Sequence, residues 1–141
     1  MSRFIVDASI AVKWFVQEVF SVESAHLLKP AFQRIVPDFF FAEVTNSIWK
    51  KVQRKELSEE EGSKIVDDLL RAPLDVFPSK HLAVNAMQLA LELSCPVYDC
   101  LYLSLALSTE SKLVTADRKF FRPVQQSRFG KSMVWVEDLA D

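Results

Sequence analysis

The sequence predicts an α/β fold in which helices cover both faces of a central, mostly parallel sheet of about five strands. Short runs rich in β-branched residues alternate with longer helical patterns along the chain, which is typical of parallel sheets. No internal repeat, low-complexity segment or linker interrupts this alternation. The chain has 141 residues, enough to bury one sizeable core. We therefore expect residues 1–141 to form a single domain with three layers, α/β/α.

Two buried strands are predicted in the first part of the chain, at 3–6 and 34–36, where short apolar runs occur. A helical pattern over 9–16 follows the first strand directly. Residues 21–29 predict a second helix before the chain reaches the second strand.

A long helix is predicted after Asp38, which we expect to cap it. The apolar stripe of this helix recurs every four positions, at Phe40, Val44, Ile48 and Val52. The next helix is predicted to begin at a capping box formed by Ser58 and Glu61 and to run to about residue 71.

The second half of the chain supplies the remaining elements. Residues 74–77 predict a third strand, and 81–93 predict a helix that ends before the next proline. Residues 99–110 are apolar nearly all round, as expected of a helix buried inside a protein. The last two strands are predicted at 112–115 and 132–136.

The cysteines and histidines are too few and too poorly spaced to form a catalytic or metal site, which leaves the carboxylates. Cys95 and Cys100 have no other cysteine to complete a zinc site, so we expect reduced, buried thiols. His26 and His81 lack the HxH or HxxxH spacing of paired ligands, and we expect neither to bind a metal. Any chemistry is therefore expected from Asp and Glu.

The predicted location is the cytoplasm. No apolar stretch reaches the roughly 18 residues needed to cross a membrane. The N-terminal MSRFIVD lacks the apolar core and cleavage site of a signal peptide. The formal net charge of −2 argues against a protein that coats polyanions in general.

Two aspartates follow predicted strands. Asp7 ends the first strand, and Asp117 lies two residues beyond the fourth. Ligands of open parallel sheets gather outside the carboxyl ends of the strands, so the topology can place both in one cleft. Each also has a local explanation, Asp7 as a helix N-cap and Asp117 as a turn residue.

Two more acids interrupt apolar segments. Glu43 follows three phenylalanines and shares a helix face with Asn46, three positions later. Asp99 opens a helix that is otherwise almost free of charge. The local alternatives are an exposed glutamate for Glu43 and an N-cap for Asp99.

The four acids together predict a metal site. Burying four anions near one another costs too much free energy unless a cation offsets them. Oxygen ligands without His or Cys select Mg²⁺ or Mn²⁺ over zinc. At a phosphodiester, such an ion lowers the pKa of a bound water, orients the phosphate and stabilises the leaving oxygen. This is nuclease chemistry.

The acids lie in four short segments: VDAS with KWF, AEVTN, YDCLYLSLA and VTADRKF. In this order and context they resemble the PIN-domain family, most closely the VapC-type toxins of bacterial and archaeal toxin–antitoxin modules. The resemblance runs from Val6 to Phe120, which is nearly the whole chain. Any one segment is weakly specific, but four in order at domain-scale spacing are fairly specific.

The resemblance implies an activity and a set of site residues. It implies an acidic cluster that binds Mg²⁺ or Mn²⁺ and cleaves RNA (tRNA, rRNA or mRNA), which inhibits translation. The acidic positions of the family are matched by Asp7, Glu43, Asp99 and Asp117. The supporting polar positions are matched by Ser9, Asn46 and Thr115. Some members have a fifth acid where this chain has Thr115.

The resemblance also implies protein partners. Members of the family form homodimers, and a cognate antitoxin inserts a segment that blocks the cleft. We therefore expect a homodimer and an antitoxin partner for this chain, in addition to its RNA substrate.

Two alternatives belong to other functional classes. A receiver-like phosphoacceptor domain has similar length, but it needs an adjacent acidic pair near the first strand and a lysine ending the last. Asp7 has no acidic neighbour, and SMVWVED ends without that lysine. A catalytically silent PIN-like module that binds RNA or protein usually lacks one of the four acids, and this chain keeps all four. We favour the nuclease.

Two basic clusters are candidates for RNA binding. One follows Asp117 directly and contains Arg118, Lys119 and Arg122. The other lies at the far end of the helix that carries Glu43, with Lys50, Lys51 and Arg54 followed by Lys55. Cations next to a metal ligand can hold a phosphate backbone. A solvated helix face is the alternative for the second cluster.

Overall fold

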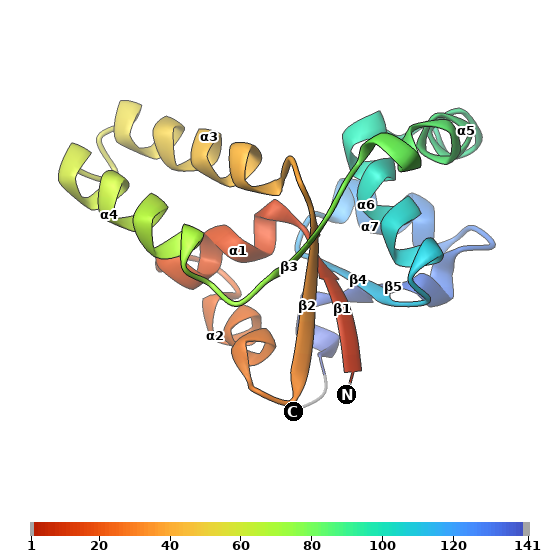
Figure 1. Ribbon diagram of the computed structural model, residues 1–141, viewed down its shortest axis with the longest axis horizontal. Helices are drawn as coiled ribbons and strands as arrows, with labels where there is room; N and C mark the ends of the chain where they lie inside the picture. Colours follow the sequence, from red (N-terminus) through yellow and green to blue (C-terminus); the bar gives the residue numbers. More distant parts are fainter. Residues whose placement is uncertain (1, 140–141) are drawn as a thin grey trace.

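Five strands form one fully parallel sheet in the order β3–β2–β1–β4–β5 (Figure 1). The computed structural model describes residues 2–139. The strands are β1 (Ser2–Val6), β2 (Phe32–Pro37), β3 (Asp75–Phe77), β4 (Lys112–Thr115) and β5 (Met133–Trp135). The predicted fold class and the predicted number of strands are confirmed.

Helices cover both sides of the sheet, which completes the three layers (Figure 1). On one side lie α1 (Ala8–Phe15), α2 (Ser21–Ala25), α3 (Phe40–Gln53) and α4 (Glu59–Leu70). On the other lie α5 (Ala83–Leu93) and α6 (Val97–Ser108), while α7 (Arg118–Gln125) connects β4 to β5. The described residues also contain short 3₁₀ helices: η1 (His26–Leu28), η2 (Lys80–Leu82), η3 (Gly130–Ser132) and η4 (Val136–Asp138).

The core is centred on β1. Ile5 lies opposite Ile35 of β2 and Leu113 of β4, and all three side chains are buried. Helix α6 packs across β1, β2 and β4. Its side chains from Tyr102 to Ala106 are buried in succession, as the all-round apolar sequence of this helix predicts. Cys95 and Cys100 are buried free thiols, as expected.

The structure corrects one sequence-based expectation about a helix and adds a helix that was not expected. Asp38 does not cap α3, because Phe39 occupies the N-cap and the Asp38 carboxylate accepts a hydrogen bond from the Ser79 amide at 3.2 Å. Helix α7 was not predicted, since its basic sequence contains Pro123, which disfavours a helix interior. The capping box of Ser58 and Glu61 at the start of α4 is confirmed.

The strand order places the site. From β1 the chain moves outward to β2 and β3, then returns to add β4 on the other side of β1. The crevice at such a reversal, outside the carboxyl ends of the two strands, is where open α/β sheets bind ligands. Asp7 directly follows β1, and Asp117 lies just beyond β4.

The helices of the described residues are too short or too polar to cross a membrane individually. The segments Lys80–Leu93 and Val97–Ser108 reach the necessary length only as a pair, and they are bent by 115° at the break between them.

A buried arginine joins the loops that precede β2 and β3. Arg34 of β2 is 8 % exposed. Its Nη1 donates to the carbonyl oxygens of Leu27 at 2.6 Å and Lys29 at 3.2 Å, and its Nε donates to that of Pro73 at 3.3 Å. One side chain thus satisfies carbonyls from two loops.

We expect Arg34→Met to lower the free energy of unfolding by about 2–4 kcal/mol, because it leaves these carbonyls without their charged donor. Urea denaturation followed by tryptophan fluorescence measures the loss. Arg71→Met is the control, since it removes an exposed pairing with Asp68 and should change stability by no more than about 0.5 kcal/mol. Equal effects of the two substitutions would contradict the structural role of Arg34.

Candidate active site

Asp7 is both a helix cap and a buried acid. Its carboxylate Oδ1 accepts hydrogen bonds from the Ile10 amide at 3.2 Å and from the Ser9 hydroxyl at 2.5 Å. The residue is only 8 % exposed. The capping interpretation of Asp7 is therefore correct, but it accounts for only part of its surroundings.

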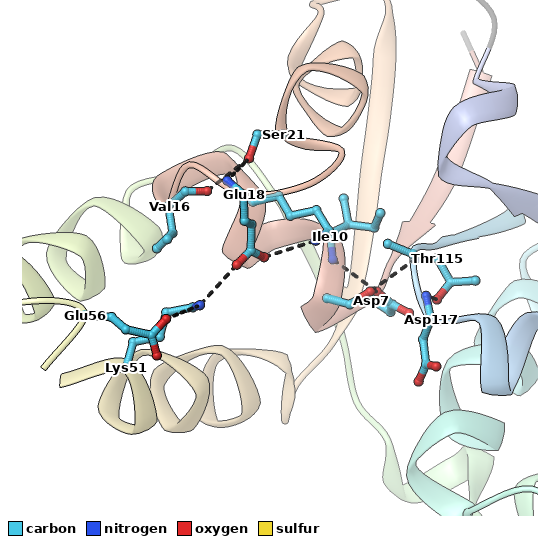
Figure 2. A network of polar contacts seen from close by, with 12 residues as sticks. Asp7, Ile10, Val16, Glu18, Ser21, Lys51, Glu56, Thr115 and Asp117 are labelled. Carbon is cyan, nitrogen blue, oxygen red and sulfur yellow. Dashed lines mark hydrogen bonds and ion pairs between the residues drawn. The ribbon is translucent and has the colours of Figure 1, made fainter. Parts of the chain in front are cut away.

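Two hydroxyls tie Asp7 to the loop after β4. The Thr115 hydroxyl hydrogen-bonds the Asp7 carboxylate and accepts the Asp117 amide at 3.1 Å (Figure 2). The Ser9 hydroxyl, which donates to Asp7, also accepts the Ala116 amide at 3.4 Å. Ser9 and Thr115 thus hold the carboxyl ends of β1 and β4 together at Asp7.

Glu43 is positioned by a tyrosine from another helix. The Tyr102 hydroxyl of α6 donates to Glu43 Oε1 at 2.6 Å and also hydrogen-bonds the Ala8 amide at the start of α1. Tyr102 is 2 % exposed, and burial followed by the neighbouring Glu43 raises its pKa above the ordinary range. The phenol therefore stays protonated and keeps donating to Glu43.

Asp99 and Asp117 both lie at helix N-termini. Asp99 is in the first turn of α6, whose N-cap is Pro96, so the N-cap interpretation of Asp99 is wrong. Asp117 is the N-cap of α7 and accepts the Lys119 amide at 3.0 Å. Helix N-termini carry partial positive charge, which favours carboxylates there.

The four carboxylates lie close enough together for the other three charges to act on Asp99. Burial raises the pKa of Asp99 to about 6, and the charges of Asp117, Asp7 and Glu43 contribute to this rise. Burial also raises the pKa of Asp7 to about 6, against the hydrogen bonds from Ser9, Thr115 and Ile10 that lower it, while Asp117 adds repulsion. The structure therefore brings together all four predicted acids.

The remaining predicted residues surround this cluster. Asn46 is exposed and lies beside Glu43 in a groove of about 340 Å³ that Phe39 and Tyr98 also line. A second groove, of about 330 Å³, is lined by Ser9, Lys13, Lys50, Lys51 and Arg54, among others.

The basic residues after Asp117 are placed differently from one another. The guanidinium of Arg118 lies 4.4 Å from the centre of the Trp135 ring and 3.9 Å from Glu137. Lys119 and Arg122 are exposed on α7.

The acidic cluster offers the oxygen ligands that hard divalent cations prefer. Four carboxylates with hydroxyl neighbours and no thiolate or imidazole suit Mg²⁺ or Mn²⁺. Among residues 2–139, however, no three Asp, Glu, His or Cys side chains are arranged around one common metal position. Asp7, Glu43 and Asp117 instead accept hydrogen bonds from protein donors. The acids fit a cation in two respects: their oxygens are suitable ligands, and their clustered negative charge would be offset by it.

The sequence model of the PIN domain matches residues 4–124. The chain belongs to the PIN domain family. It is 31 % identical over 119 residues to Ribonuclease VapC3 of Pyrobaculum aerophilum, a match that covers 83 % of this chain and 91 % of that protein. The family resemblance inferred from the sequence is confirmed.

Solved structures share the fold of this PIN domain. PAE2754 from Pyrobaculum aerophilum superposes with a TM-score of 0.67 at 20 % identity, covering 96 % of this chain and 85 % of that one. A toxin–antitoxin complex from Klebsiella pneumoniae contains a chain with a TM-score of 0.65 at 14 % identity, covering 99 % and 100 %. At these identities the likeness concerns the fold.

Two residues of the PIN domain were not predicted from the sequence: Tyr102, which donates to Glu43, and Lys13, which lines a groove with Ser9. Tyr102 lies three positions after Asp99 and Lys13 four after Ser9, so each shares a helix face with a predicted site residue. That spacing was the available signal. Tyr102 was missed because the apolar sequence of its helix predicts a core role, and Lys13 because it is a single cation and not part of a basic cluster.

The acidic cluster of the PIN domain predicts a pH-dependent gain of stability for Asp7→Asn in EDTA. The pKa of Asp7 is raised from 3.8 to about 6, so its contribution to folding is fully present below about pH 4 and is lost as the pH rises through 6. Asparagine has no such loss. We expect the free energy of unfolding of Asp7→Asn to exceed that of the wild type by about 1–3 kcal/mol at pH 7.5. This difference should disappear towards pH 4.

Urea denaturation at several pH values measures this difference. Asp67→Asn, on the exposed surface of α4, changes the formal charge by the same amount and is the control. If Asp7→Asn is instead destabilised equally at every pH, capping is the dominant role of this carboxylate.

Proposed function

We propose that this PIN domain is a metal-dependent endoribonuclease of the VapC type. The observation that carries the proposal is the convergence of Asp7, Glu43, Asp99 and Asp117 at the carboxyl ends of β1 and β4. A relative at 31 % identity that bears the name ribonuclease supports the same conclusion. The reaction would be hydrolysis of a phosphodiester bond in RNA.

In this proposal the four acids hold Mg²⁺ or Mn²⁺. When bound, the ion supplies charge neutralisation at the scissile phosphate and a water of lowered pKa. The protein's part is to fix the acids before RNA arrives. Ser9 and Thr115 orient Asp7, and Tyr102 orients Glu43. Supporting hydrogen bonds of this kind hold metal ligands in place in other metalloproteins.

The topology disfavours a receiver-like phosphoacceptor. Receiver domains have the strand order 2-1-3-4-5, with one strand on the outer side of β1. This sheet has two strands, β2 and β3, on that side. A catalytically silent module that only binds RNA or protein is disfavoured. Such a module would have no use for four acids placed close enough to repel Asp99, an arrangement that costs stability.

We propose that RNA is held by the two basic clusters and by the aromatic groove beside Glu43. Lys119 and Arg122 on α7, with Arg118, lie next to Asp117 and can bind backbone phosphates. Lys50 and Lys51 at the end of α3, and Arg54 at its C-cap, line the same groove as Ser9. Tyr98 is an exposed ring near Glu43 on which an unpaired base can stack.

We also propose a homodimer and an antitoxin partner. Val84, Met87 and Leu91 form an apolar stripe on α5 that is more than half exposed. Contiguous exposed apolar surface of this kind marks interaction sites. The structures with this fold include a toxin–antitoxin complex. A toxin with RNA as its substrate would act in the cytoplasm.

Cleavage of purified total cellular RNA tests the proposed function. The wild-type protein should cleave with Mg²⁺ or Mn²⁺ and stop in EDTA. We expect Asp99→Asn to lose more than the roughly 10- to 100-fold that removal of a supporting partner costs, because it removes a proposed ligand.

Asp138→Asn is the matched control for this experiment, since Asp138 lies in η4 beyond β5. The control should cleave like the wild type. Full cleavage in EDTA, or by Asp99→Asn, would refute the metal mechanism.

A further inference from the structure

A single carboxylate joins two lysines in the groove that Ser9 also lines. Glu18 Oε1 lies 3.1 Å from Nζ of Lys13. Glu18 Oε2 lies 3.1 Å from Nζ of Lys51 (Figure 2). The lysine side chains are only 13 % and 16 % exposed. Each oxygen of one anion is thus paired with a different, largely buried cation.

We propose that this pair of lysines is a phosphate-binding subsite for the RNA backbone and that Glu18 occupies it in the absence of RNA. A phosphodiester carries one negative charge and two equivalent non-bridging oxygens. The Glu18 carboxylate presents the same charge and the same number of acceptors to the two ammonium groups. This inference rests on the proposed function in taking RNA as the ligand.

The surroundings of the subsite favour an anion. The groove is lined by four cations, Lys13, Lys50, Lys51 and Arg54, and by one acid, Glu18. Glu56 also approaches Lys51, at a longer distance of 3.8 Å. Burial opposes ionisation of Glu18, but hydrogen bonds from Lys13 and Lys51 lower its pKa, so the carboxylate stays charged. An RNA phosphate must therefore displace a charged competitor.

The position of the subsite suits a phosphate adjacent to the acidic cluster. Ser9 and Lys13 are one turn apart on α1, roughly 6 Å along the helix axis. Ser9 itself donates to Asp7. A strand whose scissile phosphate lies at the acids can therefore place a neighbouring phosphate on the two lysines.

The backbone of Glu18 is held independently of its side chain. The Glu18 amide donates to the Ser21 hydroxyl at 2.9 Å, and that hydroxyl donates to the Val16 carbonyl at 3.0 Å. The ring of the nearby Phe20 packs edge-on against Trp135. Removing the charge of Glu18 should therefore free the lysines without unfolding the loop.

The test is binding of a fluorescein-labelled 12-nucleotide single-stranded RNA in EDTA, measured by fluorescence anisotropy. Glu18→Gln should bind roughly two- to fivefold tighter than the wild type, the factor that corresponds to one partly exposed ion pair. The salt dependence should steepen by roughly 0.7 for each additional phosphate that the freed lysines neutralise. Glu18→Ala should behave in the same way, which guards against a defect particular to glutamine.

Two further variants isolate the lysines. Adding Lys13→Gln to Glu18→Gln should abolish the increase in affinity, because the freed partner is removed. Glu92→Gln changes the net charge by the same amount and should not tighten binding. Glu92 does not line this groove, and its carboxylate lies 3.0 Å from Nη2 of Arg128.

Unchanged or weaker RNA binding by both Glu18 variants, in proteins that retain the wild-type circular dichroism, would overturn the proposal. Equal tightening in Glu92→Gln would also overturn it, because the effect would then come from net charge. Tighter binding of a polyglutamate peptide without tighter RNA binding would assign the groove to an acidic protein segment instead. Failure of the wild type to cleave RNA would count against the proposed nuclease and not against this subsite, since the assay needs no cleavage.

Discussion

The clustering of four carboxylates, with Asp7 and Asp99 withdrawn from water, is the constraint on which the rest of this structure depends. The fold brings Asp7, Glu43, Asp99 and Asp117 together at one edge of the sheet, where burial and like charge raise the pKa values of Asp7 and Asp99 to about 6. All four acids lie at the N-cap or in the first turn of a helix, where the helix dipole offsets part of the cost. The result is a site whose electrostatics favour a cation.

Hydroxyl groups connect this costly cluster to the fold. Ser9 and Thr115 join the ends of β1 and β4 through Asp7, and Tyr102 joins α6 to both α3 and α1. The same contacts that join β1 to β4, where the strand order reverses, therefore orient the acids. Glu18 has a related role one helical turn away, where it balances the charge of Lys13 and Lys51.

The sequence predicted the sheet because its strands are short, buried apolar runs, and it predicted the four acids because they interrupt such runs. It did not distinguish capping from a site role for Asp7, since the carboxylate does both. Helix α7 and the Asp38 contact with Ser79 were missed because tertiary packing, and not local pattern, decides them. Tyr102 was missed because its role requires knowing that α3 and α6 meet.

The central claim is that the acidic cluster binds a divalent cation, and the most direct measurement is the thermal unfolding midpoint, Tm, with and without Mn²⁺. Binding at a hundred times Kd stabilises the folded state by about 2.7 kcal/mol, which corresponds to several degrees for a domain of this size. We predict that millimolar Mn²⁺ raises the Tm of the wild type by that amount and leaves the Tm of Asp99→Asn nearly unchanged. No shift in the wild type, or an equal shift in Asp99→Asn, would contradict the claim.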